Sequence, residues 1–538
     1  MIPLFKIMSS NLFPFPKIFS KQNRLFLVDR PAAKVNVWFL AEAAAVFCIF
    51  VIGLAMVQYA TAALIGTDGY YHVKIGYLMR TGLIESGSLR PTFDQLPFTI
   101  LNEAAYYDHH YLYHAWLALF AWGNPLVDGG IALTQGAKLA SVLMPAIAFT
   151  AVWWLLKNQK IPFPIFWSIS LLILSEPFLY RMSMPRAQSM SLLLLVLAVH
   201  WLLQKKYSWL AALGFIFVWS YNAFPLLLVV VGVYIIATLL TEQKLAWQPF
   251  AWAAAGIVLG LIINPYFPQN ISFIIDHLAP KLGDSTTKVG NEWGAYRTIT
   301  LIENSPYTFI FLLLGIFAIG WQKERIDKRT LFMLGLAVLF GAMLFESRRF
   351  IEYFPPFVLL FAAFAAAPII HQFLEQWGNR RHWLKPSLGV LAICILAAPL
   401  QQTLTDAAEL TADSKPADRY AEASLWLHEH AGSDIQIFQT DWDDFTRLFF
   451  YNSKAKYTAG LDPTFMELHD KELFDSWVAI TRGRVENPGS IILNQFAADY
   501  VFSDLKHSTC EKQAQNDPML KEIYRDRYAV IYAVSDKN

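Results

Sequence analysis

The first residue of this sequence that could do chemistry is an aspartate in a polar turn. Asp68 opens the segment Asp68-Gly69-Tyr70-Tyr71-His72, directly after the first long apolar run. Acidic residues beside membrane spans are often functional, although one at the boundary can also be simple interfacial polarity. Gly69 permits a tight turn that would direct the carboxylate back towards the membrane. His72 is a ligand, a phosphate contact or, most commonly, an interface histidine with satisfied hydrogen bonds.

Arginines stand at two later turns on the side of the membrane that we expect to be the outer one. Arg181 and Arg186 flank one turn, and Arg349 belongs to the other. Positive charge on that side runs against the positive-inside rule, so an anion should compensate it. A lipid phosphate and an internal carboxylate are both suitable partners. Glu346 or Glu352 could pair with Arg349 in the same way.

Three further polar segments have both functional and structural interpretations. Asp108-His109-His110 has the residue types of a metal site, but its spacing is too dense for one ion, and a helix cap is the more common role. Glu303 lies where a long loop re-enters the membrane, or is simply a loop glutamate ahead of a helix that begins at Pro306. The segment Trp442-Asp443-Asp444 could bind a sugar or a cation, or cap a helix.

The composition places these residues in a membrane protein. Of 538 residues, 55% are apolar and only 16% are charged, whereas soluble domains carry about 25% charge. The net charge of +1 gives no electrostatic support for binding nucleic acid. The three cysteines lie far apart in the sequence, so they indicate neither a disulfide framework nor a thiolate metal site.

Apolar runs predict about eleven transmembrane helices. They lie near residues 37–62, 131–156, 162–178, 189–204, 207–221, 224–241, 249–265, 306–321, 329–345, 350–370 and 386–403. Basic residues gather in the connections near 157–160, 205–206, 323–329 and 380–385. These connections share one side with the basic tail, residues 1–36, which we therefore expect to be cytoplasmic. An odd number of spans places the C-terminal region outside.

The predicted domains are a cytoplasmic tail, a transmembrane domain and an outer domain. The transmembrane domain covers residues 37–404 and carries two large outer loops, 63–130 and 266–305. Residues 111–122 are too short to span and should form a helix lying at the outer surface. Residues 405–538 alternate helix-like and strand-like runs, with strands near 434–440, 498–503 and 528–534. That alternation is typical of a soluble α/β domain.

The order of these motifs along the chain resembles the C-type (GT-C) fold of integral-membrane glycosyltransferases. The resemblance is to the catalytic subunit of oligosaccharyltransferase, in its single-subunit bacterial and archaeal forms, from about residue 38 to 505. Asp68–Lys74 resembles that family's first Asp motif, and Thr300–Pro306 resembles its Ser/Thr-x-x-Glu motif. Arg349–Pro355 resembles the Arg-Phe segment, whose arginine meets the lipid pyrophosphate. Asp441–Phe445 resembles the Trp-Trp-Asp-Tyr-Gly motif.

Two departures from the family pattern affect what the resemblance implies. The second acidic motif should fall at Pro185-Arg186-Ala187-Gln188, which contains no carboxylate. A family metal ion would lose ligands there. The acceptor motif has Asp441 in place of the first tryptophan and Asp444-Phe445 in place of Tyr-Gly. Recognition of an asparagine-linked sequon is therefore in doubt, and a different acceptor fits better.

The resemblance implies an enzyme that moves a sugar or glycan from a polyprenyl-phosphate or diphosphate carrier. The acceptor would be a glycan, lipid or protein at the outer face of the cytoplasmic membrane. Asp68 and Glu303 would be catalytic, and Arg349, Arg186 and His72 would bind the donor phosphate. Trp442, Asp443 and Asp444 would bind the acceptor.

A divalent metal, magnesium or manganese, would be held by Asp68 and Glu303 if one is present, although arginines could replace it as fixed cations. The alternative function is a transporter or flippase for a lipid-linked sugar. Transporters place broken or polar helices at the middle of the membrane. Here the polar residues gather at the outer edge instead, which favours surface chemistry.

Overall fold

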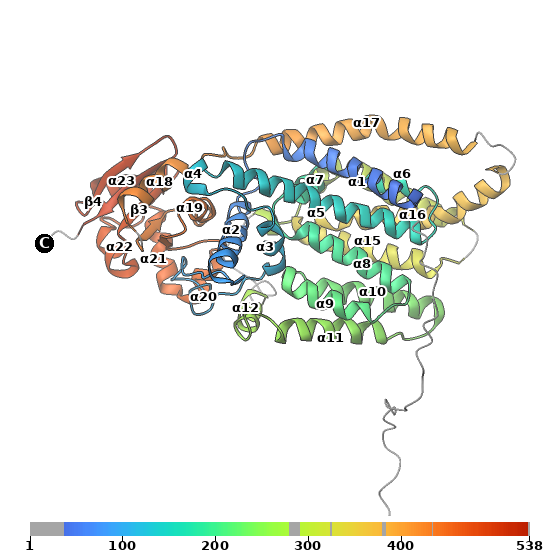
Figure 1. Ribbon diagram of the computed structural model, residues 1–538, viewed down its shortest axis with the longest axis horizontal. Coiled ribbons are helices and arrows are strands. Elements are labelled where there is room, and N and C mark those ends of the chain that lie inside the picture. The colour runs from blue at the N-terminus through green and yellow to red at the C-terminus, as the bar shows by residue number, and fades with distance from the viewer. Residues whose placement is uncertain (1–36, 279–290, 323–324, 379–383, 433, 536–538) are drawn as a thin grey trace, which may run out of the picture. The chain divides into compact units, whose positions relative to one another are not determined.

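Apolar helices dominate the chain up to about residue 412 (Figure 1). The computed structural model describes residues 37–278, 291–322, 325–378, 384–432 and 434–535. The basic tail 1–36, Gly290, Lys323, Arg380 and Arg381, which entered the sequence analysis, lie outside the described residues. Residues 43–538 form one compact unit and residues 1–42 another. The fold and the site described below belong to the larger unit.

Six described helices are long and apolar enough to cross a membrane. They are α1 (Val37–Gln58), α5 (Ile131–Asn158), α10 (Pro225–Glu242), α15 (Lys328–Glu346), α16 (Phe354–Phe373) and α17 (Leu384–Ala412). The pair formed by α6 (Pro164–Ile169) with η1 (Ser170–Ile173) and α7 (Glu176–Ser183) bends by 89° and would make a seventh span. The chain is therefore a multi-pass membrane protein.

Four further apolar helices are shorter than a full span. They are α8 (Gln188–Leu203), α9 (Trp209–Ser220), α11 (Gln248–Ile262) and α14 (Pro306–Trp321). Length and composition support six or seven spans in the described chain, so the number eleven stays a prediction. Each expected apolar run does contain a helix. Glycines let the helices α9 and α11 approach closely, because a Cβ on Gly256 would lie 2.1 Å from the carbonyl oxygen of Ala211.

The connections on one side of the helices carry short helices. The first long loop contains α2 (Gly69–Ser86), α3 (Tyr111–Ala118) and α4 (Pro125–Asp128), and the second contains α12 (Gln269–Leu278), η3 (Asn291–Trp293) and α13 (Thr298–Glu303). A further turn, η4 (Arg348–Glu352), joins α15 to α16. The helix expected over residues 111–122 is α3, which ends at Ala118.

The C-terminal region is an α/β domain with a five-stranded sheet of order β2-β1-β3-β5-β4. Its strands are β1 (Gln436–Gln439), β2 (Lys456–Tyr457), β3 (Tyr500–Asp504), β4 (Leu520–Arg525) and β5 (Ala529–Val534). Strands β1, β2 and β3 are parallel, while β5 pairs antiparallel with β3 and β4. The three strands expected from the sequence are β1, β3 and β5. Helix α17 continues to Ala412, beyond the expected domain boundary at residue 404.

Two apolar cores cover the two faces of this sheet, because successive strand residues point to opposite sides. On one face, Ile437, Phe502 and Ile531 pack with α18 (Ala421–His430) and α19 (Phe445–Tyr451). On the other, Phe438 and Val501 pack with α21 (Lys471–Thr481), α22 (Gly489–Phe496) and α23 (Ser508–Asn516). The domain therefore has three layers, and α20 (Thr464–His469) precedes α21.

Helix α2 of the first loop completes the first of these cores. Tyr71, Ile75 and Met79 belong to the same buried cluster as the sheet residues above. The buried Lys74 Nζ donates a hydrogen bond of 3.0 Å to the carbonyl oxygen of Phe450 at the end of α19. The C-terminal domain thus fixes the helix whose first turn carries Asp68.

Candidate active site

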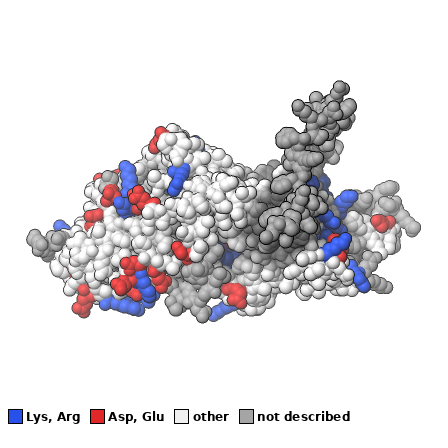
Figure 2. All heavy atoms as spheres, turned by 90° about the horizontal axis from the view of Figure 1, so that it is seen from below, with Lys and Arg blue, Asp and Glu red and all other residues white. Residues whose placement is uncertain are grey.

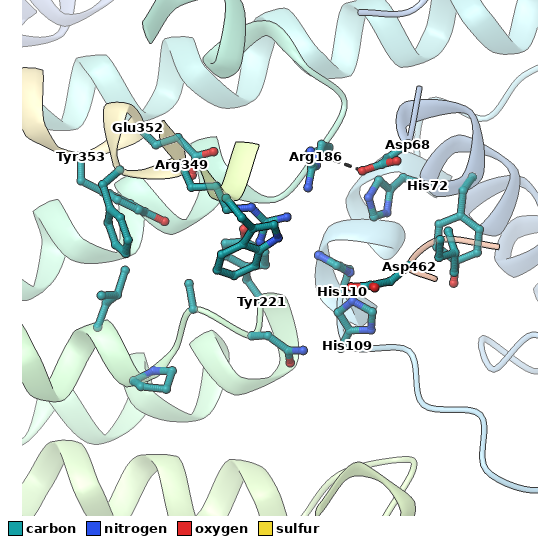
Figure 3. Close-up of a pocket in the computed structure, with 18 of the residues that line it drawn as sticks. Asp68, His72, His109, His110, Arg186, Tyr221, Arg349, Glu352, Tyr353 and Asp462 are labelled. Atoms are coloured by element: carbon teal, nitrogen blue, oxygen red, sulfur yellow. Dashed lines mark ion pairs between the residues drawn. The ribbon is translucent and has the colours of Figure 1, made fainter. Parts of the chain in front are cut away.

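A cavity of about 300 Å³ lies between the first loop, the apolar helices and the C-terminal domain (Figure 3). Asp68 and His72 enter it from the start of α2, and His109 and His110 from the turn before α3. The other walls come from the turn with Arg186, the segment 221–226 between α9 and α10, Trp293 of η3, residues 349–353 and the loop 461–465. Segments far apart in the sequence therefore meet at one polar site.

Asp68 presents its carboxylate to this cavity. It is the N-cap residue of α2, yet its side chain makes no capping hydrogen bond. Its Oδ2 lies 3.3 Å from Nη1 of Arg186, and 31% of the side chain is exposed. Burial among protein atoms raises the pKa of Asp68, while the nearby Arg186 opposes that shift. Asp68 is thus a carboxylate with increased basicity beside a fixed cation.

Gly69 allows the two sides of this ion pair to approach. A Cβ at residue 69 would lie 2.4 Å from Cγ of Pro185, which is a distance that real side chains do not adopt. Gly69 is the first residue of α2 and its φ is not positive. A positive φ is therefore not the reason for the glycine, and close approach to Pro185 explains it.

Three arginines converge on one carboxylate, that of Glu292. Arg181 Nη1 donates to Glu292 Oε2 over 2.8 Å, and Arg186 Nη1 does so over 3.3 Å. Arg349 Nε donates to Glu292 Oε1 over 2.9 Å. Burial alone would raise the pKa of Glu292, but the three guanidinium groups hold it far below its ordinary value. Arg181 also pairs with Glu352, because Arg181 Nε donates a hydrogen bond of 2.8 Å to Glu352 Oε1.

Backbone and side-chain contacts hold the turns η3 and η4 against each other. Ser347 Oγ donates to the carbonyl oxygen of Glu292 (3.1 Å), and the Arg348 amide donates to that of Gly294 (3.1 Å). The guanidinium of Arg349 stacks over Trp293 at 4.1 Å. Internal carboxylates therefore compensate the arginines in this structure. The partner of Arg349 is Glu292, so the expected pairing with Glu346 or Glu352 is wrong.

A row of hydrogen bonds runs from Asp108 to the cavity. Asp108 Oδ2 lies 2.8 Å from His114 Nδ1, and His114 Nε2 lies 2.8 Å from His72 Nδ1. Burial lowers the pKa of His72 well below its ordinary value. His72 is therefore neutral at pH 7 and contributes no positive charge to a phosphate site. Asp108 also accepts a hydrogen bond from the His110 amide, as a cap would, but it is buried rather than at the surface.

The expected acceptor motif lies next to the cavity rather than in its wall. Trp442 packs against the second sheet core, and Asp444 is buried beneath it. Burial, followed by the neighbouring carboxylates of Asp441 and Asp504, raises the pKa of Asp444 to about 8. Asp443 forms an ion pair of 2.8 Å with Lys415 and is close enough to Asp68 to raise its pKa further.

Structural roles explain part of this motif. Asp441 Oδ1 accepts a hydrogen bond from the Asp443 amide, which confirms the helix-cap interpretation. In the following loop, Leu461, Asp462 and Phe465 reach the cavity. The C-terminal domain therefore contributes Asp462, which the sequence analysis did not choose, in addition to the nearby Asp443.

The structure does not bring Glu303 to the site. It is the last residue of α13, where its side chain is exposed, and it is not part of the cavity wall. Glu292, eleven residues earlier in the same loop, instead forms the ion pairs with Arg181, Arg186 and Arg349 behind the cavity wall. The expected pairing of Asp68 with Glu303 as metal ligands therefore fails among the described residues.

The carboxylates of the site do not fit a magnesium or manganese ion. Arg186 Nη1 lies 3.3 Å from Asp68 Oδ2 and 3.3 Å from Glu292 Oε2. The guanidinium thus occupies the place between two carboxylates that a hard cation would need, since such ions require several carboxylate oxygens. The segment Pro185-Arg186-Ala187-Gln188 consequently supplies a cation where the family pattern has an acid.

Two features of the site were present in the sequence but were missed. His110 and His114 are separated by four residues, which places both on one face of a helix. Glu292 stands beside a tryptophan in a loop whose other acid, Glu303, had a better motif match. Only the folded chain shows that three arginines from two distant turns reach Glu292.

Comparison with known proteins establishes the fold. No family model matches this sequence, and no curated protein matches it. The structure is similar to the archaeal oligosaccharyltransferase AglB of Archaeoglobus fulgidus, solved with an inhibitory peptide and a dolichol-phosphate (TM-score 0.61, 13% identity, 93% of this chain and 75% of that one). It is also similar to ArnT from Cupriavidus metallidurans, bound to undecaprenyl phosphate (TM-score 0.54, 14% identity). That match covers 93% of this chain and 98% of the ArnT chain.

A third similar structure is the mycobacterial arabinofuranosyltransferase AftD (TM-score 0.54, 13% identity), where the match covers 93% of this chain and 42% of that one. All three are C-type glycosyltransferases. This chain therefore has the C-type glycosyltransferase fold, as its motifs predicted.

Proposed function

We propose that this protein is a membrane glycosyltransferase that uses a polyprenyl-phosphate or diphosphate sugar as its donor. The observation that carries the proposal is the cavity itself. It places the Asp68 carboxylate, with its raised pKa, beside Arg186 and opposite a wall that contains Arg349, within a C-type fold. Transfer occurs at the outer face of the cytoplasmic membrane, on the side of the C-terminal domain.

The arginines form the donor phosphate site. Arg349 and Arg186 both line the cavity and present planar guanidinium groups that suit phosphate oxygens. The apolar side chains of Pro225, Leu226 and Phe350 line the same cavity next to the membrane helices, where a polyprenyl chain would lie. AglB and ArnT were solved with dolichol-phosphate and undecaprenyl phosphate, which supports a donor of this class.

Asp68 acts as the general base. An acceptor hydroxyl or amide attacks the anomeric carbon of the donor sugar, a new glycosidic bond forms, and the bond to the lipid phosphate breaks. Asp68 accepts the proton that the acceptor loses. The phosphate leaves with the bonding electrons, and the arginines neutralise its charge. Arg186 serves both groups because it lies between Asp68 and the rest of the arginine cluster.

The C-terminal domain supplies the acceptor side of the site. Asp462 reaches the cavity and Asp443 lies close to Asp68. Trp442 packs against the second sheet core and Asp444 is buried, and neither side chain lines the cavity. Their role in acceptor binding is therefore indirect.

The test is donor consumption by the purified protein. Undecaprenyl-phosphate and undecaprenyl-diphosphate sugars with a radiolabelled sugar are incubated with the protein and with surface glycan extracts as acceptor. We expect label to move from lipid to acceptor with the wild type and not with Asp68→Asn. Flipping of a fluorescent donor in liposomes by both proteins, without any transfer, would instead show the transporter alternative.

A further inference from the structure

Three buried histidines form a compact group at the wall of the cavity. His72 comes from α2, His110 is the N-cap residue of α3, and His114 lies in the first turn of α3. One ligand nitrogen from each residue lies within 4.8 Å of the other two. The exposed fractions of the residues are 4%, 8% and 0%. Two adjacent helices thus bring three imidazoles together away from bulk water.

Hydrogen bonds orient this group as the ligands of a metal are oriented. His114 holds the carboxylate of Asp108 with Nδ1, at 2.8 Å, and turns Nε2 towards His72. Metal-binding histidines characteristically use their second nitrogen in this way, which fixes the tautomer and the ring orientation.

His110 provides the second, independent observation. Its Nδ1 is buried and has no hydrogen-bond partner among the described residues. A buried polar atom without a partner is costly, and native structures rarely retain one that has no use. Its ring lies 4.7 Å from that of His72, centroid to centroid. The unpartnered nitrogen therefore belongs to the same histidine group.

We propose that His72, His110 and His114 bind one transition-metal dication, with zinc as the best match. Imidazole nitrogens suit zinc, cobalt and copper, whereas magnesium and calcium require oxygen ligands. With Zn–N bonds of about 2.0–2.1 Å, tetrahedral nitrogens lie about 3.3 Å apart. The ligand nitrogens lie within 4.8 Å of one another, so side-chain rotations would have to bring them to that spacing when the metal binds.

The fourth coordination position faces the cavity. His72 and His110 line the cavity and His114 lies behind them, so an open position would point towards Asp68 and Arg186. Three protein ligands with one open position are typical of catalytic zinc sites. The expected ligand is a phosphate oxygen of the donor, and this last step rests on the proposed function.

Metal content is the direct test. The full-length protein is purified without chelator, dialysed against zinc or cobalt, and analysed by elemental mass spectrometry and by the visible absorption of cobalt. We expect about one equivalent per chain in the wild type and at least roughly tenfold weaker binding in His72→Gln and His110→Gln. The matched control is His109→Gln, because His109 also lines the cavity but lies outside the group. It should retain the metal.

Each outcome decides the proposal. A wild-type protein that binds neither zinc nor cobalt, or a folded His110→Gln variant that binds the metal as the wild type does, overturns it. A second readout is Asp108→Asn, which keeps the three ligands and should weaken binding by about tenfold or more. Sugar transfer by a metal-free protein would overturn the role of the metal in the reaction and leave the proposed function intact. Metal binding by a protein that transfers no sugar would leave the metal site intact and overturn the proposed function.

Discussion

The charge of Asp68 is the first property to test, because the carboxylate stands in the cavity without a capping role. Asp68→Asn keeps the size of the side chain but cannot accept the acceptor proton. We expect sugar transfer to fall by at least about 100-fold, with the amount of folded protein in the membrane unchanged. Near-normal transfer by a well-expressed Asp68→Asn variant would remove Asp68 from the mechanism.

The pH dependence of transfer follows from the raised pKa of Asp68. A general base acts only when it is deprotonated, so kcat/KM should fall as the pH drops through that pKa. The acid limb of the profile should therefore lie above the ordinary aspartate value of about 3.9. Asp68→Asn should abolish this limb in its residual activity. If the wild type and Asp68→Asn show the same acid limb, then a group other than Asp68 causes it.

Arg349 should contribute to donor affinity through its geometry as well as its charge. Arg349→Lys keeps the charge but loses the planar pair of donors and the stacking on Trp293, so donor binding should weaken by about tenfold. The matched control is Arg348→Lys, since Arg348 Nε donates to the carbonyl oxygen of Ala295 and Arg348 does not line the cavity. Equal donor affinity in wild type and Arg349→Ala would contradict the assignment.

Glu292 forms ion pairs with the arginines that we propose for the donor phosphate. Glu292→Gln removes that competing charge, so the donor should bind roughly three- to tenfold more tightly. Without donor the variant should melt at a lower temperature, because the buried Arg181 and the half-buried Arg186 and Arg349 lose their shared partner. Donor titration by fluorescence and melting curves with and without donor measure both effects. Weaker donor binding in Glu292→Gln would show that Glu292 organises the arginines instead.

Single residues show how far sequence reasoning reached. Asp68, Arg186 and Arg349 were predicted from local motifs and do meet in one cavity. Glu303 matched a motif equally well but is exposed outside the cavity wall. A motif records the type and spacing of residues, whereas the choice between Glu292 and Glu303 depends on how a loop packs against η4.

At the scale of elements, the contact between α2 and the turn 184–187 sets the distance from Asp68 to Arg186. Gly69→Ala would place a Cβ against Pro185, pushing the start of α2 away. We expect transfer to fall by about tenfold or more, because small displacements of a reacting group are costly. Gly232→Ala in α10 is the control, since nothing lies within 4 Å of a Cβ there.

Adding Pro185→Ala to Gly69→Ala should restore part of the activity, because it removes the ring atoms that clash. If the Gly69→Ala variant and the Gly69→Ala/Pro185→Ala double variant lose activity equally, then Gly69 matters for a reason other than its contact with Pro185. Normal transfer by Gly69→Ala would show that the turn tolerates the shift.

Elements with a strong period or composition were predictable, and short ones were not. Long apolar runs and the strands β1, β3 and β5 follow from sequence pattern. The two-residue strand β2 has no pattern of its own, and β4 lacks a regular alternation, with only Leu520 buried and the other five residues exposed or half-buried. The helices α20 and α21 are separated only by Asp470, whose side chain caps α21 by accepting a hydrogen bond from the Leu473 amide.

At the scale of the whole molecule, the C-terminal domain and the first loop share one core. Tyr71 and Ile75 of α2 belong to the same cluster as the sheet residues Ile437 and Ile531. The domain therefore does more than cover the site, because it holds the helix that carries Asp68 and His72. No local sequence feature predicts this, since it depends on contacts between segments more than 350 residues apart, such as Lys74 with Phe450.

The basic connections and the cavity lie at different ends of the helices. Arg329 Nη1 reaches the carbonyl oxygen of Gln159 (3.4 Å), and Lys328 pairs with Glu242 (2.6 Å). The expected cytoplasmic connections thus meet each other, while the cavity and the sheet domain adjoin the opposite helix ends. On the face shown in Figure 2, many charged side chains gather towards one end of the molecule, and a second group lies towards the other end. This arrangement fits a multi-pass membrane protein, and the orientation itself stays a prediction.

Reporter fusions test that orientation on the full-length protein. Alkaline phosphatase folds only outside the cytoplasm and green fluorescent protein fluoresces only inside it when exported through the general secretory route. A C-terminal fusion should therefore give active phosphatase and no fluorescence. The matched control is an insertion at Lys205-Lys206, a basic connection between α8 and α9, which should give the opposite result. A fluorescent C-terminal fusion would place the cavity on the cytoplasmic side, and with it the donor headgroup and the acceptor that the proposed reaction requires outside.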